Sequence, residues 1–250
     1  MNTKIALITG ATSGIGRSTA HEFAKHNIKL VLCGRRQDRL DIIKKALEKD
    51  TDVYTLNFDV RDKKATVEAI NSLPEEFSKI DILINNAGNA HGLDFIQDGD
   101  SDDWDAMIDI NVKGLLYVSN AIIPKMTERK SGHIINIGSS AGKEVYPKGN
   151  VYCASKHAVL AITEGMRIDL NPYGIKVGAV NPGLVETEFS KVRFKGDPKA
   201  DSVYKGFQAL QPQDIAEIIY FVISRPYHVN IADLLVFPTA QASSTILKKD

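Results

Sequence analysis

Residues 4–16, KIALITGATSGIG, join a short apolar run to a glycine-rich turn and to the start of a helical pattern. The run is rich in aliphatic residues, which predicts a buried strand. Glycines at positions 10, 14 and 16 allow the backbone to approach an anion, and a helix that begins there points its positive end at that anion. The stretch predicts a strand, a pyrophosphate-binding turn and a helix, although a tight connection without a ligand would use similar glycines.

Five further apolar runs follow along the chain, at residues 28–33, 53–58, 81–86, 133–138 and 176–181. Segments with apolar residues at helical spacing lie among them, at residues 16–25, 37–49, 65–73, 103–126 and 151–170. This alternation predicts βαβ units and a parallel sheet with helices on both faces. We therefore expect an α/β fold, a single domain over residues 1–250 built on a doubly wound, Rossmann-type parallel sheet.

The composition is ordinary for a soluble protein and argues against several classes. Acidic and basic residues number 31 each, so no nucleic-acid partner is expected. No apolar run approaches the roughly 18 residues of a membrane span, and the glycine turn comes too early for a signal peptide, so we expect a cytoplasmic protein without a membrane partner. Cys33 and Cys153 supply neither a disulfide framework nor a metal site, and no metal is predicted.

Arg35 and Arg36 follow the second apolar run, where an NAD-binding sheet usually has an acid for the ribose 2′-hydroxyl. A carboxylate would repel a 2′-phosphate, whereas a guanidinium pairs with it through two hydrogen bonds. An exposed arginine pair on the next helix is the alternative. At this position the pair predicts NADP as the cofactor.

Tyr152 and Lys156 lie four residues apart near the start of the helical segment 151–170, so both side chains project from one face. An ammonium beside a phenol favours the phenolate, and we expect Lys156 to lower the pKa of Tyr152. Tyr152 could then exchange a proton with an alcohol or a carbonyl. A packed ring beside a solvated lysine has the same spacing, so the pair needs partners.

Ser139 is the candidate partner, because it ends an apolar run at the sheet edge where ligands bind and precedes Tyr152 by 13 residues. Its hydroxyl could hold the substrate oxygen beside the Tyr152 hydroxyl. Ser140 competes for this role, and a strand-end serine that satisfies the next turn is the structural alternative.

Five features, taken in chain order, resemble the motifs of short-chain dehydrogenases/reductases: TGATSGIG (9–16), NNAG (85–88), Ser139, the Tyr152 and Lys156 pair, and NPGLVET (181–187). The resemblance implies that Asn111 is a fourth catalytic residue, which positions a water linking Lys156 to solvent; a buried polar residue at a helix kink is the alternative. It also implies cofactor contacts by Gly10, Thr12, Ser13, Gly14, Ile15, Gly16, Arg35, Arg36, Asp59, Val60, Asn86, Ala87, Gly88, Tyr152, Lys156, Pro182, Gly183, Val185 and Thr187.

KVRFKGD (191–197) and PYHVNI (226–231) resemble one subgroup, the NADP-dependent 3-hydroxy acid dehydrogenases, also called serine dehydrogenases. That resemblance implies oxidation of the 3-hydroxyl of serine, allo-threonine and 3-hydroxy acids, reduction of malonic semialdehyde, and a homotetramer or homodimer. Because the core motifs do not encode the substrate, a reductase for another ketone, sugar or acyl group is an alternative. A non-catalytic NADP-binding sensor is an alternative of another class.

Residues 184–207 interrupt the regular pattern and are rich in Lys, Gly and Asp, which predicts a substrate loop; a surface insertion without function is the alternative. A small acid substrate needs a cation, and the loop offers Arg193 and Lys195. Arg193 is preferred because a guanidinium binds a carboxylate through two hydrogen bonds. We therefore expect Ser139, Tyr152 and Arg193 to contact the substrate.

Overall fold

The computed structural model describes residues 3–250, in which seven parallel strands form one sheet with the order β3-β2-β1-β4-β5-β6-β7. The strands are β1 (Ile5–Thr9), β2 (Lys29–Gly34), β3 (Val53–Asn57), β4 (Ile82–Asn85), β5 (His133–Ile137), β6 (Lys176–Pro182) and β7 (Asp233–Val236). The chain winds outward in opposite directions from the boundary between β1 and β4. The predicted doubly wound α/β fold is thus confirmed, and ligands of such sheets bind at the carboxyl ends of the strands near this boundary.

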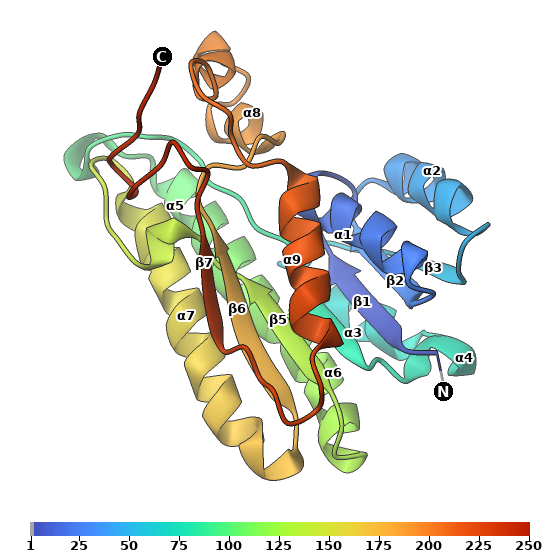
Figure 1. Ribbon diagram of the computed structural model, residues 1–250. Coiled ribbons are helices and arrows are strands. Elements are labelled where there is room, and N and C mark those ends of the chain that lie inside the picture. The colour runs from blue at the N-terminus through green and yellow to red at the C-terminus, as the bar shows by residue number, and fades with distance from the viewer. Residues whose placement is uncertain (1–2) are drawn as a thin grey trace.

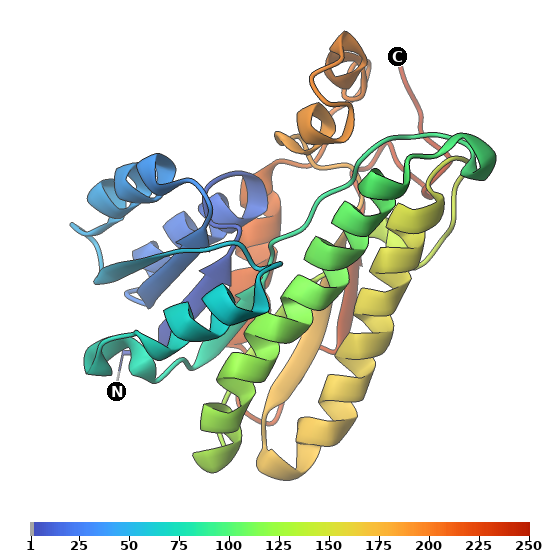
Figure 2. The same ribbon diagram turned by 180° about the vertical axis from the view of Figure 1, so that it is seen from behind.

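Helices cover both faces of the sheet. The face toward the viewer in Figure 1 carries α1 (Gly14–Lys25), α2 (Gln37–Leu47) and α9 (Pro212–Ser224). Figure 2 shows the opposite face, with α3 (Lys63–Asn71), α6 (Leu115–Glu128) and α7 (Asn150–Leu170). Shorter helices are α4 (Glu75–Ser78), α5 (Ser101–Ile108) and α8 (Phe189–Arg193).

Two hydrophobic cores follow from this layering. In β1, Ile8 packs into the core under α1 and α9, while its neighbour Leu7 packs into the core under α3 and α6. Successive side chains of a strand point to opposite faces, so a strand covered on both sides is apolar throughout. That is why the strand-forming runs are mostly hydrophobic and were visible in the sequence.

The stretch 101–128 is one continuous helical element, in which a π-helical segment, Asp109–Gly114, separates α5 from α6. It meets the length and apolar composition of a membrane span, contrary to the expectation that no stretch would. It packs against the sheet and α3, burying Val118, Ile122 and Met126 in the core. Its apolar character is that of a core helix of a soluble protein.

Strand β7 was not predicted from the sequence. This strand has only four residues, and its side chains alternate between exposed and half-buried because it is the edge of the sheet. It pairs in parallel with β6, with Asn181 opposite Leu235. Its apolar run, at residues 234–237, is only four residues long and was not recognised as a strand.

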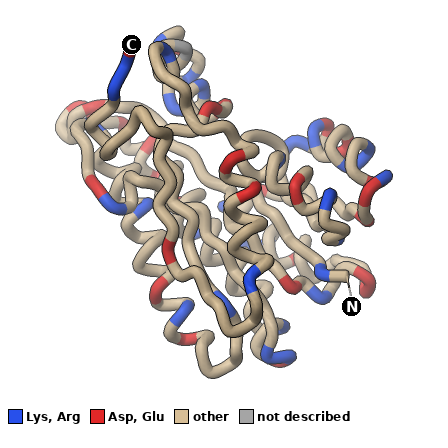
Figure 3. The backbone as a smooth tube through the Cα atoms, viewed as in Figure 1, with Lys and Arg blue, Asp and Glu red and all other residues tan. Residues whose placement is uncertain are grey.

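The helical bounds otherwise differ by a few residues from those predicted. The helical element predicted over 103–126 spans residues 101–128, and the helix predicted over 37–49 ends at Leu47. Cys33 and Cys153 are both buried and form no disulfide. Figure 3 shows Lys and Arg interspersed with Asp and Glu along the chain, in keeping with the balanced charge.

Candidate active site

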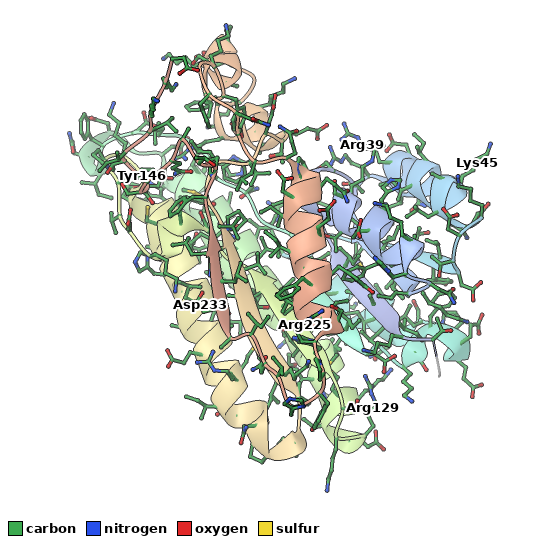
Figure 4. All side chains as sticks on the ribbon, in the orientation of Figure 1. Arg39, Lys45, Arg129, Tyr146, Arg225 and Asp233 are labelled. Carbon is green, nitrogen blue, oxygen red and sulfur yellow. The ribbon has the colours of Figure 1, made fainter. Side chains whose placement is uncertain are left out.

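A cavity of about 520 Å³ opens at the carboxyl ends of the strands. Figure 4 labels Arg39 and Tyr146, which lie toward opposite ends of this edge of the molecule. Most of the predicted site residues, drawn from well-separated parts of the chain, line this one cavity: Gly10, Thr12, Ser13, Gly14, Ile15, Arg35, Arg36, Asp59, Val60, Asn86, Ala87, Gly88, Ser139, Tyr152, Lys156, Pro182, Gly183, Val185, Thr187 and Arg193. Two predicted residues, Gly16 and Asn111, lie behind the lining.

The glycine-rich turn between β1 and α1 has a backbone that favours glycine at two positions. Gly10 has φ +64° and Gly14 has φ +51°, in the left-handed region that side chains with a Cβ rarely adopt. Gly14 begins α1, whose first N–H groups have no helical partner, and Gly14 and Ile15 line the cavity. This arrangement provides an anion-binding helix N-terminus.

Gly16 and Asn86 hold the same turn from behind. The Asn86 amide donates to the carbonyl oxygens of Thr9 (2.9 Å) and Gly10 (3.2 Å). A Cβ on Gly16 would collide with that amide and lie 2.6 Å from Gly10 O. Gly16 therefore permits the packing of the turn and does not line the cavity, while Asn86 lines the cavity with its amide committed to the turn.

The two arginines after β2 have different partners. Arg36 donates to Thr12 Oγ1 (2.8 Å) and Ser13 Oγ (3.1 Å), which places its guanidinium beside the glycine turn. Arg35 Nη1 lies 3.4 Å from Asp59 Oδ2. Burial opposes ionisation of Asp59, but hydrogen bonds from Arg61 outweigh it and lower the pKa of the carboxyl. This end of the cavity therefore holds two cations and an ionised acid.

The lining fits a dinucleotide with an added phosphate. The glycine turn and the start of α1 suit a pyrophosphate, and Arg35 and Arg36 lie one strand away, where a ribose 2′-phosphate would extend. A Cβ on Gly14 would lie 3.2 Å from Thr187 Cγ2, so the turn and the segment after β6 leave no room there for a larger residue.

Tyr152 and Lys156 project together from the first turns of α7, and both are buried. Lys156 Nζ donates to Ile137 O at the end of β5 (2.9 Å). A Cβ on Gly88 would lie 3.5 Å from the same Nζ, so the NNAG segment also reaches the lysine. The predicted Tyr152 and Lys156 pair therefore lies beside the carboxyl ends of β4 and β5.

Ser139 and Ser140 both line the cavity, and Ser139 is the one whose side chain influences the pKa of Tyr152. It adopts extended backbone before a 3₁₀ turn, Ser140–Gly142, and its Oγ accepts a hydrogen bond from Ala141 N (3.1 Å). Hydrogen bonding with Ser139 lowers the pKa of Tyr152, in opposition to the larger effect of burial. The structural interpretation of Ser139, a strand-end serine that satisfies the next turn, therefore holds, and the contact of its hydroxyl with a substrate oxygen stays a prediction.

The protonation states differ from those predicted. Burial raises the pKa of Tyr152, and Ser139 and Arg193 oppose this only in part. Burial also lowers the pKa of Lys156, to about 8. The predicted lowering of the Tyr152 pKa by Lys156 does not outweigh burial in this arrangement, in which the Lys156 ammonium donates to the Ile137 carbonyl. At neutral pH Tyr152 is a neutral phenol, the form that donates a proton.

Asn111 lies in the π-helical segment, where the widened helix turns its side chain inward. Its amide donates to Asn89 O (2.8 Å) and Ser155 Oγ (3.0 Å), and its Oδ1 accepts from Asn89 N (2.9 Å). A Cβ on Gly88 would lie 2.9 Å from the same oxygen. Asn111 thus fixes the segment after β4 beside Lys156, and π-helical turns recur at functional sites.

The segment 184–207 forms short helices that rise above the carboxyl edge of the sheet (Figure 1). Its Arg193 donates from Nε to Gly92 O (3.0 Å) and from Nη1 to Tyr146 Oη (3.0 Å). The guanidinium carbon lies 5.6 Å from the ring centre of Tyr152. Lys195, the competing cation, pairs instead with Asp103 (2.9 Å) outside the cavity.

Several lining residues carried no sequence signal. Tyr146 and Phe189 pack around Tyr152, and the ring centres of Phe189 and Tyr152 are 5.6 Å apart. Gln241, near the carboxyl end, accepts a hydrogen bond from Leu184 N (2.9 Å) and so attaches the last residues to the segment after β6. None belongs to a recognisable motif, and only the fold brings them to the cavity. Among residues 3–250 no cluster of His, Cys, Asp or Glu is arranged for a metal ion.

Residues 4–197 match the family model described as "short chain dehydrogenase". The chain belongs to the short-chain dehydrogenase family. Membership confirms the resemblance drawn from the motifs and accounts for the cavity geometry, with a serine, a tyrosine and a lysine at one end of a dinucleotide-sized groove.

Two relatives match over nearly the whole chain. An "NADP-dependent 3-hydroxy acid dehydrogenase" of Schizosaccharomyces pombe is 47% identical over 245 residues, 96% of this chain and 95% of that protein. A "Sulfoacetaldehyde reductase 2" of Chromohalobacter salexigens is 45% identical over 242 residues, 96% of each chain. Among solved structures, "The Closed form of serine dehydrogenase complexed with NADP+" has a TM-score of 0.92 at 43% identity, and the match covers 98% of this chain and 99% of that one.

Proposed function

We propose that this protein is an NADP-dependent oxidoreductase that interconverts the 3-hydroxyl of small hydroxy acids, such as serine, allo-threonine and 3-hydroxy acids, with a carbonyl, as in malonic semialdehyde. One observation carries the proposal: a cation from the substrate segment, Arg193, lines the same cavity as Ser139 and Tyr152. The relatives named for 3-hydroxy acids support this substrate class. Residues 1–250 would form one catalytic domain, with 184–207 as its substrate loop.

In the direction of reduction, Tyr152 would donate its proton to the carbonyl oxygen. The burial that raises its pKa keeps the phenol protonated for this step. Ser139 would hold the same oxygen. NADP supplies the hydride chemistry when bound, and the protein orients the reacting groups and moves the proton.

In the direction of oxidation, Tyr152 must act as a phenolate, and Lys156 is the charge that would stabilise it. With a pKa of about 8, Lys156 carries its charge through most of its population at neutral pH. The hydrogen bonds that join Asn111 to Ser155 and to the Asn89 backbone support a polar route near Lys156 along which a proton would leave. Asn111 would thus position the relay, as the family resemblance implies.

The choice of NADP over NAD is supported by charge. Arg35 and Arg36 line the cavity at the end of β2, where a carboxylate would be expected for NAD. The pyrophosphate would lie on Gly10, Thr12, Ser13, Gly14 and Ile15. The nicotinamide end would contact Pro182, Gly183, Val185 and Thr187, with Val60 and Asp59 beside the adenine.

The anionic group of the substrate would be bound by Arg193. The described lining contains four cations: Arg35 and Arg36 at the far end, the buried Lys156, and Arg193 beside Tyr152. Nη2 of Arg193 donates to none of the described protein groups. One relative is named for the reduction of sulfoacetaldehyde, a molecule that carries an anionic group near its carbonyl. An arginine binds such an anionic group through charge-assisted hydrogen bonds.

A homotetramer or homodimer in the cytoplasm would fit the surface. Leu116 on α6 is 40% exposed and Ile168 on α7 is 65% exposed, on the two longest helices. Apolar side chains on neighbouring helices suit a symmetric interface. The buried thiols of Cys33 and Cys153 are compatible with a reducing compartment.

The test follows the absorbance of the reduced cofactor while L-serine, L-allo-threonine and 3-hydroxypropionate are offered with NADP or with NAD. We expect turnover with NADP and its loss in Tyr152→Phe, which keeps the ring and removes the proton-carrying oxygen. Reduction of unrelated ketones without activity on these acids would leave a carbonyl reductase and refute the hydroxy acid assignment. Cofactor binding without turnover of any alcohol or carbonyl would favour the sensor.

A further inference from the structure

Glu188, at the start of the substrate segment, forms ion pairs across the mouth of the cavity. Both of its carboxylate oxygens lie 2.9 Å from Arg39 Nη1, and Oε2 lies 3.3 Å from Arg36 Nη1. Partial burial works against the charge, but hydrogen bonds from Arg39 and Arg36 outweigh it and lower the pKa of Glu188. The ionised carboxylate of Glu188 is therefore bound to Arg36, at the end of β2, and to Arg39, at the start of α2.

Arg36 has few donors left for a ligand. A guanidinium has five N–H groups, and Nε and Nη2 of Arg36 already bond to Thr12 and Ser13 while Nη1 bonds to Glu188. A two-bond grip on a phosphate therefore requires that one of these partners leave. Among the described residues Glu188 is the charged partner of Arg36, and a phosphate dianion beside it would be repelled. Glu188 is the group that must move.

We propose that Glu188 is an internal counter-ion that stands in for the 2′-phosphate of NADP, so that cofactor binding exchanges carboxylate for phosphate and releases the start of the segment 184–207. This inference rests on the proposed NADP dependence and extends it to cofactor discrimination. NAD has no phosphate to exchange and leaves the segment tied to Arg36 and Arg39. The substrate loop thereby responds to the cofactor that the enzyme uses.

The first test measures dissociation constants for NADP⁺, NAD⁺, 2′,5′-ADP and 5′-AMP by calorimetry. Glu188→Gln removes the competing charge, and we expect NADP⁺ and 2′,5′-ADP to bind about threefold to tenfold more tightly, as expected for the loss of two half-exposed ion pairs. NAD⁺ and 5′-AMP should change less than twofold. Glu186→Gln is the matched control, because it removes the same charge from the same segment and its carboxylate bonds to Gln211 instead of an arginine.

The second test measures how readily trypsin cleaves the segment 184–207. Trypsin cuts after Lys and Arg, and the segment offers Lys191 and Lys195 outside the ion pairs of Glu188. In the unaltered protein 2′,5′-ADP should accelerate cleavage there and 5′-AMP should not, while Glu188→Gln should be cut quickly without any ligand. The adenosine fragments lack nicotinamide, so they report on the phosphate alone.

The outcomes separate this inference from the proposed function. If the unaltered protein binds 2′,5′-ADP no better than 5′-AMP, the NADP assignment fails and takes the inference with it. If it prefers 2′,5′-ADP but Glu188→Gln does not tighten that binding, or tightens 5′-AMP equally, the inference alone is overturned. Protection of the segment by 2′,5′-ADP would also overturn it.

Discussion

Arg193→Gln should selectively impair substrates that carry a carboxylate. The guanidinium is positioned by Gly92 O and Tyr146 Oη, and its carbon lies 5.6 Å from the ring centre of Tyr152. A hydrogen bond to a charged group is worth about 1.5–3 kcal/mol. At 1.36 kcal/mol for each tenfold change in rate, the loss in kcat/KM for 3-hydroxypropionate should be roughly 10-fold to 150-fold.

The assay compares this acid with 1,3-propanediol, which presents the same hydroxyl without a charge. Arg193→Gln should leave kcat/KM for the diol within about threefold, so the ratio of the two values falls by roughly the factor above. Tyr146→Phe is the matched control, because it removes one support of the guanidinium and keeps the charge; the ratio should then fall less than tenfold. Equal losses for acid and diol in Arg193→Gln would refute the anion subsite and indicate that Arg193 only anchors the segment.

Three further predictions concern stability and the catalytic frame. His133 is buried and its pKa is lowered from 6.5 to about 3, so the unfolded chain binds a proton that the folded chain does not. The contribution of His133 to the unfolding free energy should fall by ~1.6 kcal/mol between pH 6.5 and 5. His133→Leu should flatten the pH dependence in urea titrations by that amount, and an unchanged slope would be the contrary result. Gly16→Ala should destabilise the folded protein by about 1–3 kcal/mol and weaken NADP⁺ binding. Thermal unfolding with and without the cofactor measures both effects, and values equal to those of the unaltered protein would refute the packing argument. Asn111→Ala should lower kcat about 10²-fold or more with less than threefold change in the NADP⁺ dissociation constant, whereas an unchanged kcat would remove Asn111 from the relay.

The features visible in the sequence are those that one segment encodes locally. Strands covered on both faces are mostly apolar, so the central strands were predictable, and the edge strand β3 was recognised because the run at 53–58 is also rich in apolar residues. Tyr152 and Lys156 share a helix, and Arg35 and Arg36 follow a strand, so their places in the cavity followed from the fold class. The position of a side chain that acts within one helix or strand, or at the end of one, can be predicted from the sequence around it.

Other features arise only from tertiary contact. Arg39 and Glu188 are 149 residues apart and meet because β2 and the end of β6 share one edge. The raised pKa of Tyr152 depends on how completely α7, Phe189 and Tyr146 enclose it, which helical spacing does not reveal. Gly16 shares the glycine motif with the lining residues, yet its role is set by the Asn86 amide behind it.

Transfer of hydrogen from C3 of a hydroxy acid to NADP is the central claim, and isotopic labelling tests it most directly. The protein is incubated with NADP⁺ and L-serine deuterated at C3 or, separately, at C2, and the reduced cofactor is analysed by mass spectrometry. The account predicts one deuterium in the reduced cofactor from the C3-labelled substrate and none from the C2-labelled substrate. Label arriving from C2, or no reduced cofactor from either substrate, would contradict it.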